Sequence, residues 1–201
     1  MLRECLADTR LPDDPTAVVM PPGSENWHDD IIAALSESLK PAGVLIPVIE
    51  RDSGLTVLLT QRSAELKHHA GQISFPGGGM EDHDANIQAT ALRETHEEVG
   101  IEPNDVTVIG FLNPMPTVTG YAVTPVIGVV LSDPNALDID QTEVEFAFEV
   151  PLAFLLDNRN ACATEREFRG HTVPILEFRY EGHKIWGATA HMLLELGKKV
   201  F

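Results

Sequence analysis

The chain has 201 residues, 43% of them hydrophobic, and a formal net charge of −17 at pH 7. This length and composition fit one globular domain, so we expect a single domain over residues 1–201, with residues 1–40 as an N-terminal extension that contains a helix. The acidic balance excludes a protein that binds nucleic acid through a broad basic face, but it permits a small anionic substrate held by a metal or a local basic pocket.

The N-terminal residues show no charged-then-apolar signal pattern, and the longest apolar run, "VTPVIGVVL" (residues 123–131), is typical of a buried strand rather than of a membrane span. Cys5 and Cys162 lie far apart and form no ligand pattern, which favours a reduced chain. We therefore expect a cytoplasmic protein without membrane or nucleic-acid partners. Its oligomeric state is open, with a homodimer as one option.

Apolar periodicity and turn residues, taken in chain order, predict helices interleaved with strands. The expected helices cover residues 26–39, 84–99, 151–157 and 187–200. The expected strands cover residues 43–50, 55–62, 72–75, 105–112, 121–131, 144–150, 165–170 and 172–180. The run "PGGG" (residues 76–79) is typical of a glycine turn. This order favours the α/β class, as an α/β/α sandwich with a mixed parallel and antiparallel sheet.

The second expected helix ends in an acidic stretch, "RETHEEVG", which crowds Glu94, Glu97 and Glu98 together. Like charges three and four residues apart on a helix repel by about 0.2–0.5 kcal/mol per pair, and a helix C-terminus disfavours anions. Helical spacing puts Glu98 at the edge of the buried stripe, where a carboxylate needs a counter-charge. Arg93 can reach Glu97, but one guanidinium does not neutralise three carboxylates. A divalent cation with oxygen ligands would offset the repulsion; an ordinary acidic helix face with one salt bridge is the alternative.

The longer stretch "FPGGGMEDHDANIQATALRETHEEVGI" resembles the Nudix box, over about residues 79–101. Two positions depart from that pattern. Ala85, preceded by Asp84, stands where the box has a glutamate, and Thr95 stands where it has an apolar residue. The resemblance implies the Nudix fold and a metal-dependent hydrolase of pyrophosphate bonds.

A second stretch, "LLTQRSAELKHHAGQISFPGG" (residues 58–78), resembles the signature of the coenzyme A pyrophosphatase branch of Nudix hydrolases. It implies cleavage of coenzyme A or its derivatives to 3′,5′-ADP and 4′-phosphopantetheine, with Mg²⁺ or Mn²⁺. One alternative is a Nudix hydrolase of ADP-ribose, NADH or a dinucleoside polyphosphate, which this second signature disfavours. Another is a Nudix-fold sensor that binds a nucleotide without turnover, which the complete glutamate set disfavours.

The resemblance also implies roles for the acidic residues. Glu94 and Glu98 are expected to hold the metal, and Glu97 either completes that set or acts as the general base. Arg93 is expected to hold the cluster in orientation. A further acid from a downstream loop is implied as ligand or base, and Glu143 in "QTEVEF" is best placed for it, with an ordinary solvated glutamate as the alternative.

Recognition of an anionic substrate requires cations and close backbone approach. The densest basic cluster comprises Arg62, Lys67, His68 and His69. We expect Arg62 and Lys67 to contact substrate phosphates and the two histidines to be exposed loop residues. Lys67 stands where the signature usually has arginine, so the charge is kept without bidentate geometry. Gly77 and Gly78 allow the backbone to approach the substrate.

Asp84 precedes the apolar periodicity of the acidic helix, so we expect it to cap the helix N-terminus. The alternative is that its carboxylate supports the metal cluster through Arg93 or a water molecule.

Overall fold

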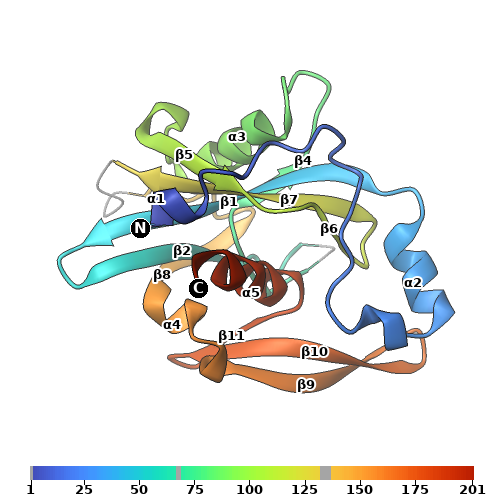
Figure 1. The fold of residues 1–201 in the computed structure, drawn as a ribbon. Helices are drawn as coiled ribbons and strands as arrows, with labels where there is room; N and C mark the ends of the chain where they lie inside the picture. Colours follow the sequence, from blue (N-terminus) through green and yellow to red (C-terminus); the bar gives the residue numbers. More distant parts are fainter. Residues whose placement is uncertain (1, 67–68, 132–136) are drawn as a thin grey trace.

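The computed structural model describes residues 2–66, 69–131 and 137–201 (Figure 1). Its α-helices are α1 (Leu2–Cys5), α2 (Asp29–Ser36), α3 (Ile87–Val99), α4 (Leu152–Leu156) and α5 (Ala188–Val200). The strands are β1 (Lys40–Arg51), β2 (Gly54–Arg62), β3 (Ile73–Ser74), β4 (Gly77–Gly79), β5 (Val106–Phe111), β6 (Met115–Pro116), β7 (Tyr121–Val130), β8 (Val144–Pro151), β9 (Ala161–Phe168), β10 (His171–Tyr180) and β11 (His183–Trp186). Within the described ranges, none of the helices is long and apolar enough to cross a membrane.

Strand β1 lies at the centre of the larger sheet, whose order is β3-β2-β1-β7-β5. It pairs in parallel with β7 along most of its length and antiparallel with β2 and β4 at its other edge. Strand β8 adds to β2, and β6 adds to β7. The mixed parallel and antiparallel sheet predicted from the sequence is therefore confirmed.

The edge of β1 opposite β7 is shared by two strands. Strand β4 pairs with the first part of β1, at residues 42–44, and β2 pairs with the last part, at residues 48–51. Between them the Leu45 N–H donates to the Pro76 carbonyl, at 2.9 Å. This division brings the end of β2 and the start of β4 to the same side of the molecule, next to α3.

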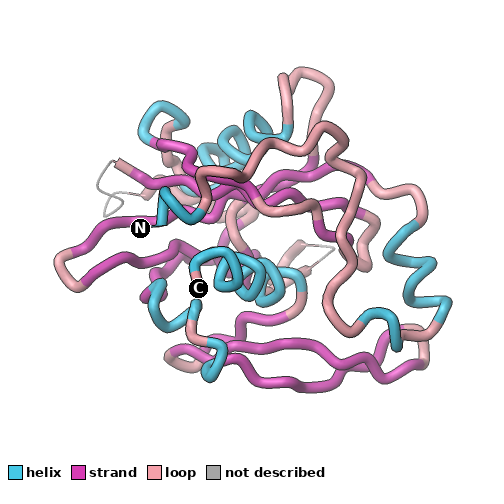
Figure 2. Tube along the Cα trace, in the orientation of Figure 1, coloured by secondary structure: helices cyan, strands magenta, loops and turns pink. Residues whose placement is uncertain are grey.

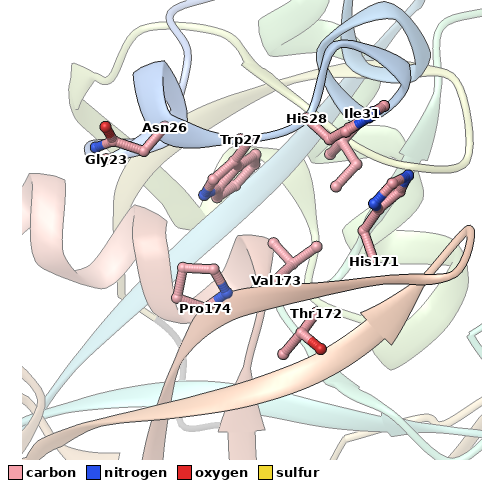
Figure 3. A pocket seen from close by; sticks show the side chains of 9 residues that line it. All are labelled: Gly23, Asn26, Trp27, His28, Ile31, His171, Thr172, Val173 and Pro174. Carbon is pink, nitrogen blue, oxygen red and sulfur yellow. The ribbon is translucent and has the colours of Figure 1, made fainter.

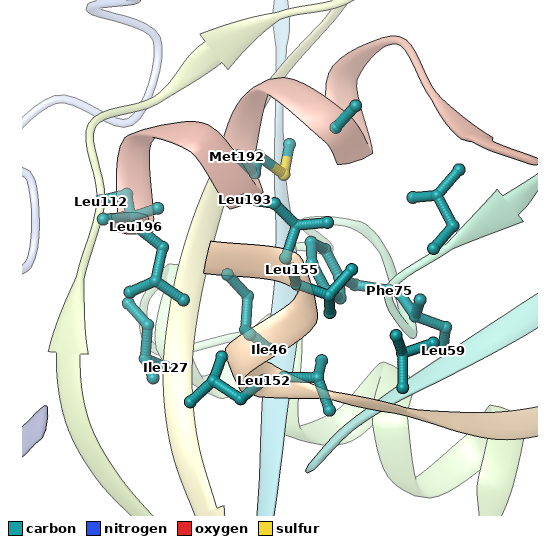
Figure 4. Packing of buried hydrophobic residues seen from close by; sticks show 14 of the residues in the cluster. Ile46, Leu59, Phe75, Leu112, Ile127, Leu152, Leu155, Met192, Leu193 and Leu196 are labelled. Atoms are coloured by element: carbon teal, nitrogen blue, oxygen red, sulfur yellow. The ribbon is translucent and has the colours of Figure 1, made fainter. Parts of the chain in front are cut away.

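Helices cover both faces of the sheet, as Figures 1 and 2 show, with α3 on one face and α4 and α5 on the other. Strand β1 alternates between the faces: Leu45 packs with Ala91 of α3, and Ile46 belongs to the cluster that includes Leu193 of α5. Figure 4 shows the leucines of α4 and α5 gathered over Ile46 and Ile127. Burial on both faces explains the nearly continuous apolar run of β1 and confirms the α/β/α layering.

The remaining strands, β9, β10 and β11, form a separate antiparallel sheet in the order β11-β10-β9. In Figure 1 it lies below α5, and α2 stands at one end of its β9–β10 hairpin. Ile31 and Leu35 of α2 pack with Val173 of β10 in one buried cluster. The N-terminal segment also joins the main core, because Leu6 is 1% exposed and packs within it. Residues 1–40, expected to be an extension, are thus anchored at two places in the described chain.

The structure differs from the sequence predictions at several element boundaries. The glycine turn expected at residues 76–79 is wrong, because Gly77–Gly79 forms strand β4. Helix α3 begins at Ile87 rather than at Asp84. Strand β9 begins at Ala161, four positions before the predicted strand, and β6 and β11 were not predicted. Glycine disfavours a strand locally, so only the pairing with β1 explains why β4 is extended.

Candidate functional site

Helix α3 is fixed at both ends by residues suited to those positions. The Asn86 side chain accepts the Ala89 N–H at 3.0 Å, and Gly100 ends the helix in the left-handed conformation, with φ 73°. The expectation that Asp84 caps this helix is therefore wrong. Asn86 caps as well as aspartate and directly precedes the first apolar helical residue. Thr95, at the departing position, is buried, and its hydroxyl donates to the Ala91 carbonyl at 2.6 Å.

Asp84 instead binds Arg93 across the loop that precedes the helix. Its carboxylate accepts hydrogen bonds from Arg93 Nε at 3.0 Å and Nη2 at 2.9 Å, and from the Thr90 hydroxyl at 3.0 Å. The hydrogen bonds from the Arg93 guanidinium hold the pKa of Asp84 well below its usual range. Asp84 therefore carries the acidic role beside Arg93, which was the alternative to the cap.

Arg93 distributes its remaining donors over the glutamates of its own helix. Nη1 donates to Glu94 Oε1 and to Glu97 Oε2, both at 2.9 Å, and Nη2 donates to the Gly79 carbonyl at 3.2 Å. The predicted contact between Arg93 and Glu97 is thus confirmed. Asp84 and β4 hold the guanidinium from the other side, so the hydrogen bond from Arg93 restrains the Glu94 side chain.

Glu98 is the most buried of the three helix glutamates, with 2% of its surface exposed. Its Oε1 lies 3.4 Å from Nη1 of Arg62, at the end of β2, and its Oε2 accepts the Gly77 N–H at 3.3 Å. Burial raises the pKa of Glu98 to about 8, although the charge of Arg62 and the Gly77 hydrogen bond act in the opposite direction. The helical spacing correctly predicted that this carboxylate is not freely solvated.

Two glycines of β4 lie where no side chain would fit. A Cβ atom on Gly78 would overlap the Glu94 carboxylate, including Oε1 at 2.7 Å. Gly77 has φ 150°, and a Cβ there would meet the backbone of Gly43 and Val44 on β1. Both positions therefore require glycine: Gly77 for the strand to approach β1, and Gly78 for the carboxylate to lie against the backbone.

Glu143 belongs to the same group of charges. The loop that carries Glu143 is fixed to α3, because the Asp140 N–H donates to the Glu98 carbonyl at 3.1 Å. The backbone carbonyl of Glu143 also accepts the Ser63 N–H at 2.8 Å. Burial, above all, raises the pKa of Glu94, and the charges of Glu97 and Glu143 raise it further. Glu143 also raises the pKa of Glu98. The charge of the downstream acid chosen from sequence therefore acts on two of the helix glutamates.

These carboxylates fit a hard divalent cation. Glu94 and Glu98 are partly or fully buried, repel one another, and have Arg93 and Arg62 as the described cations that offset them. Carboxylate oxygens are the ligands that Mg²⁺ and similar ions prefer, and a bound cation would offset the repulsion between them. Glu97 is the most exposed of the three, with 55% of its side chain accessible, and Arg93 holds it by one hydrogen bond.

The structure describes only part of the basic cluster predicted from the sequence, namely Arg62 and His69. Arg62 lies against Glu98, with 22% of its side chain exposed, and its buried Nε has no described partner. Lys67 and His68 lie outside the described residues. His69 is half-buried rather than an exposed loop residue: its ring nitrogens contact Gln72 at 2.8 Å and Thr119 at 3.0 Å.

Comparison with known proteins connects this geometry to one family. The NUDIX domain pattern matches residues 39–186. Two curated relatives, each called "Uncharacterized Nudix hydrolase NudL", come from Escherichia coli and Shigella boydii; they are 44% and 45% identical over 162 residues, which is 80% of this chain and 83% of each relative. A MutT/nudix family protein from Enterococcus faecalis has a similar fold, with a TM-score of 0.50 and 16% identity, covering 80% of this chain and 61% of that chain.

Proposed function

Because the chain belongs to the Nudix family, whose hydrolases act on pyrophosphate bonds in nucleoside diphosphate derivatives, we propose that its substrate is coenzyme A or one of its derivatives. Water would add across the P–O–P bridge, so that each product gains one new phosphomonoester. The products would be 3′,5′-ADP and 4′-phosphopantetheine, or the corresponding acylated form.

One observation supports this substrate above the others. Arg62, Gly77 and Gly78 all come from the stretch that resembles the coenzyme A pyrophosphatase signature, and all three lie against Glu94 or Glu98. The second signature therefore borders the glutamates of the Nudix box. Residues that distinguish a substrate branch are expected at such a border, because they can contact both the substrate and the catalytic group.

We assign the following roles within this proposal. Glu94 and Glu98, with Glu97, would hold Mg²⁺ or Mn²⁺, which neutralises charge on the pyrophosphate oxygens and activates water. Arg93 orients Glu94 and Glu97 through the hydrogen bonds described above. Glu143 would accept a proton, a role supported by its exposure and by the effect of its charge on the pKa of Glu94 and of Glu98.

Substrate contacts come from the other side of the carboxylate group. Arg62 would bind the pyrophosphate, because its guanidinium already lies at Glu98. Gly77 and Gly78 would let the substrate approach β4 closely. Lys67, outside the described residues, remains a proposed contact on the sequence pattern alone.

The test is to incubate the protein with Mg²⁺ or Mn²⁺ and a panel of coenzyme A, dephospho-coenzyme A, acyl derivatives, ADP-ribose, NADH and a dinucleoside polyphosphate, and to identify products by mass. We expect coenzyme A or an acyl derivative to give the highest kcat/KM, and the Glu98→Gln variant to serve as the inactive control. Faster turnover of ADP-ribose, NADH or the dinucleoside polyphosphate would replace the substrate assignment. Tight nucleotide binding without turnover of any compound would indicate a sensor.

The single domain over residues 1–201, the cytoplasmic location and the homodimer stay predictions of the sequence.

A further inference from the structure

Two histidines and an aspartate form a cluster away from the glutamates, where α2 meets the β9–β10 hairpin. His28 immediately precedes α2, Asp30 is its second residue, and His171 is the first residue of β10. Asp30 Oδ2 lies 3.6 Å from His28 Nδ1 and 3.8 Å from His171 Nε2. One nitrogen or oxygen atom from each residue lies within 4.8 Å of the other two.

We propose that His28, Asp30 and His171 bind one divalent transition-metal ion, of which Zn²⁺ is the representative. Two imidazoles and a carboxylate are ligands that suit Zn²⁺, Ni²⁺ or Cu²⁺, whereas Mg²⁺ prefers oxygen alone. Tetrahedral ligands at about 2.1 Å from an ion lie about 3.4 Å from one another. The two distances to Asp30 exceed that separation by only a few tenths of an ångström.

The backbone that carries these side chains is held by packing. Ile31, next to Asp30, and Val173, two residues after His171, are each at most 6% exposed and lie in one buried cluster with Leu35. The ligands therefore belong to segments 143 positions apart in sequence (171 − 28) that already contact each other. Metal binding would therefore require side chains to move, but not α2 or the β9–β10 hairpin.

One such movement is required. The His28 and His171 rings are stacked, with centroids 3.8 Å apart and planes inclined by 19°. A bound metal lies in the plane of each imidazole ring, so two nearly parallel rings cannot both direct a lone pair at one ion. His28 is the ring expected to turn, because 52% of its side chain is exposed, against 33% for His171. Turning it ends the 3.3 Å hydrogen bond from the Asp30 N–H to Nδ1.

A cavity of about 530 Å³ lies beside the cluster and leaves room for the remaining metal ligand. Figure 3 shows both histidines at one end of it, with Trp27 and Pro174 toward the other end. A water molecule at this end would complete a four-coordinate site. The surrounding charges are mixed: Asp29 adds a carboxylate at the same helix end, while the Arg169 guanidinium donates to the Asp30 carbonyl at 3.3 Å.

The experiment is a calorimetric titration with Zn²⁺ at about pH 7.5, where imidazole is ordinarily uncharged. Excess Mg²⁺ is present to occupy the oxygen ligands of α3. The parent is compared with His171→Gln and Asp30→Asn, and with His96→Gln as the matched control. His96 is also an exposed histidine near a carboxylate, 3.7 Å from Glu102, but among the described residues it forms no cluster with a second imidazole.

We expect the parent and the His96→Gln control to bind one Zn²⁺ at least about 10-fold more tightly than the other two variants do. Zn²⁺ should also raise the melting temperature of the parent more than that of either ligand variant, because binding to the folded state alone stabilises it. Equal affinity and stoichiometry in all four proteins, or equal thermal shifts, would overturn the proposal. If one ligand variant fails to fold, the other decides by the same comparison.

Discussion

Replacing Glu98 by glutamine should separate the stability of the fold from the function of the site. The substitution keeps the side-chain volume, and the new amide oxygen can still accept the Gly77 N–H. It removes a carboxyl group whose pKa burial raises from 4.5 to about 8. A carboxyl with a raised folded-state pKa favours folding at low pH, and that contribution is lost as pH rises from the unfolded pKa to the folded one.

The size of the stability change follows from the pH range between the unfolded and the folded pKa of Glu98. One pKa unit corresponds to about 1.4 kcal/mol, so at pH 7 the metal-free parent has lost up to roughly 3 kcal/mol relative to pH 4. The glutamine variant cannot ionise and escapes this loss. At about 2–4 °C per kcal/mol for a chain of this size, its metal-free melting temperature at pH 7 should exceed that of the parent by several degrees. At pH 4 the two should melt together.

The assay is thermal unfolding from pH 4 to pH 8, in chelator and in Mg²⁺, together with turnover of coenzyme A. We expect turnover to fall at least about 100-fold and the protection by Mg²⁺ to weaken. Glu97→Gln is the control for stability, because it is the same substitution on the same helix at a side chain that is 55% exposed. A Glu98→Gln protein that melts below the parent at pH 7 in chelator, or keeps normal turnover and full protection by Mg²⁺, would refute the reasoning.

Three further substitutions test the surroundings of the buried glutamate. Gly78→Ala should lower turnover at least about 100-fold by displacing Glu94. Gly79→Ala should stay active, because the added Cβ meets only an ordinary 3.6 Å contact. Equal turnover of the two variants in steady-state assays would contradict this. Asp84→Asn should lower kcat about 10–100-fold. It should also make stability against urea less sensitive to acid below about pH 4, because the Asp84 carboxylate, with its low pKa, stabilises the fold only while it is ionised. A variant with the parental dependence of stability on pH would exclude that role. Arg62→Ala should raise KM more than it lowers kcat, equally for coenzyme A and dephospho-coenzyme A, and an unchanged KM for both would remove it from the site.

Local patterns in the sequence predicted the parts of the site that lie on one element. Spacing along a single helix predicted the burial of Glu98 and the contact between Arg93 and Glu97, because both follow from 3.6 residues per turn. The pairing of Asp84 with Arg93 was only an alternative, since it depends on how the loop before the helix folds back. Asn86 is better placed to cap the helix, and it was the signal in the sequence that could have decided between the two roles of Asp84.

Contacts between distant segments could not be predicted in this way. The approach of Arg62 to Glu98 depends on β1 dividing one edge between β2 and β4. Strand β4 itself contradicts the local preference of three consecutive glycines and exists because β1 supplies its hydrogen-bond partners. The stacking of His28 on His171 likewise arises from the docking of α2 on a hairpin far along the chain.

A strand made only of glycine has a consequence for how specificity could evolve. Strand β4 presents backbone alone beside Glu94, so it offers no side chain that could be exchanged to favour one substrate over another. Variation must then arise in its neighbours, such as the end of β2 at Arg62 or the start of β7 at Tyr121, which borders Gly79. The chemistry and the choice of substrate can therefore diverge independently among descendants of one ancestral sequence.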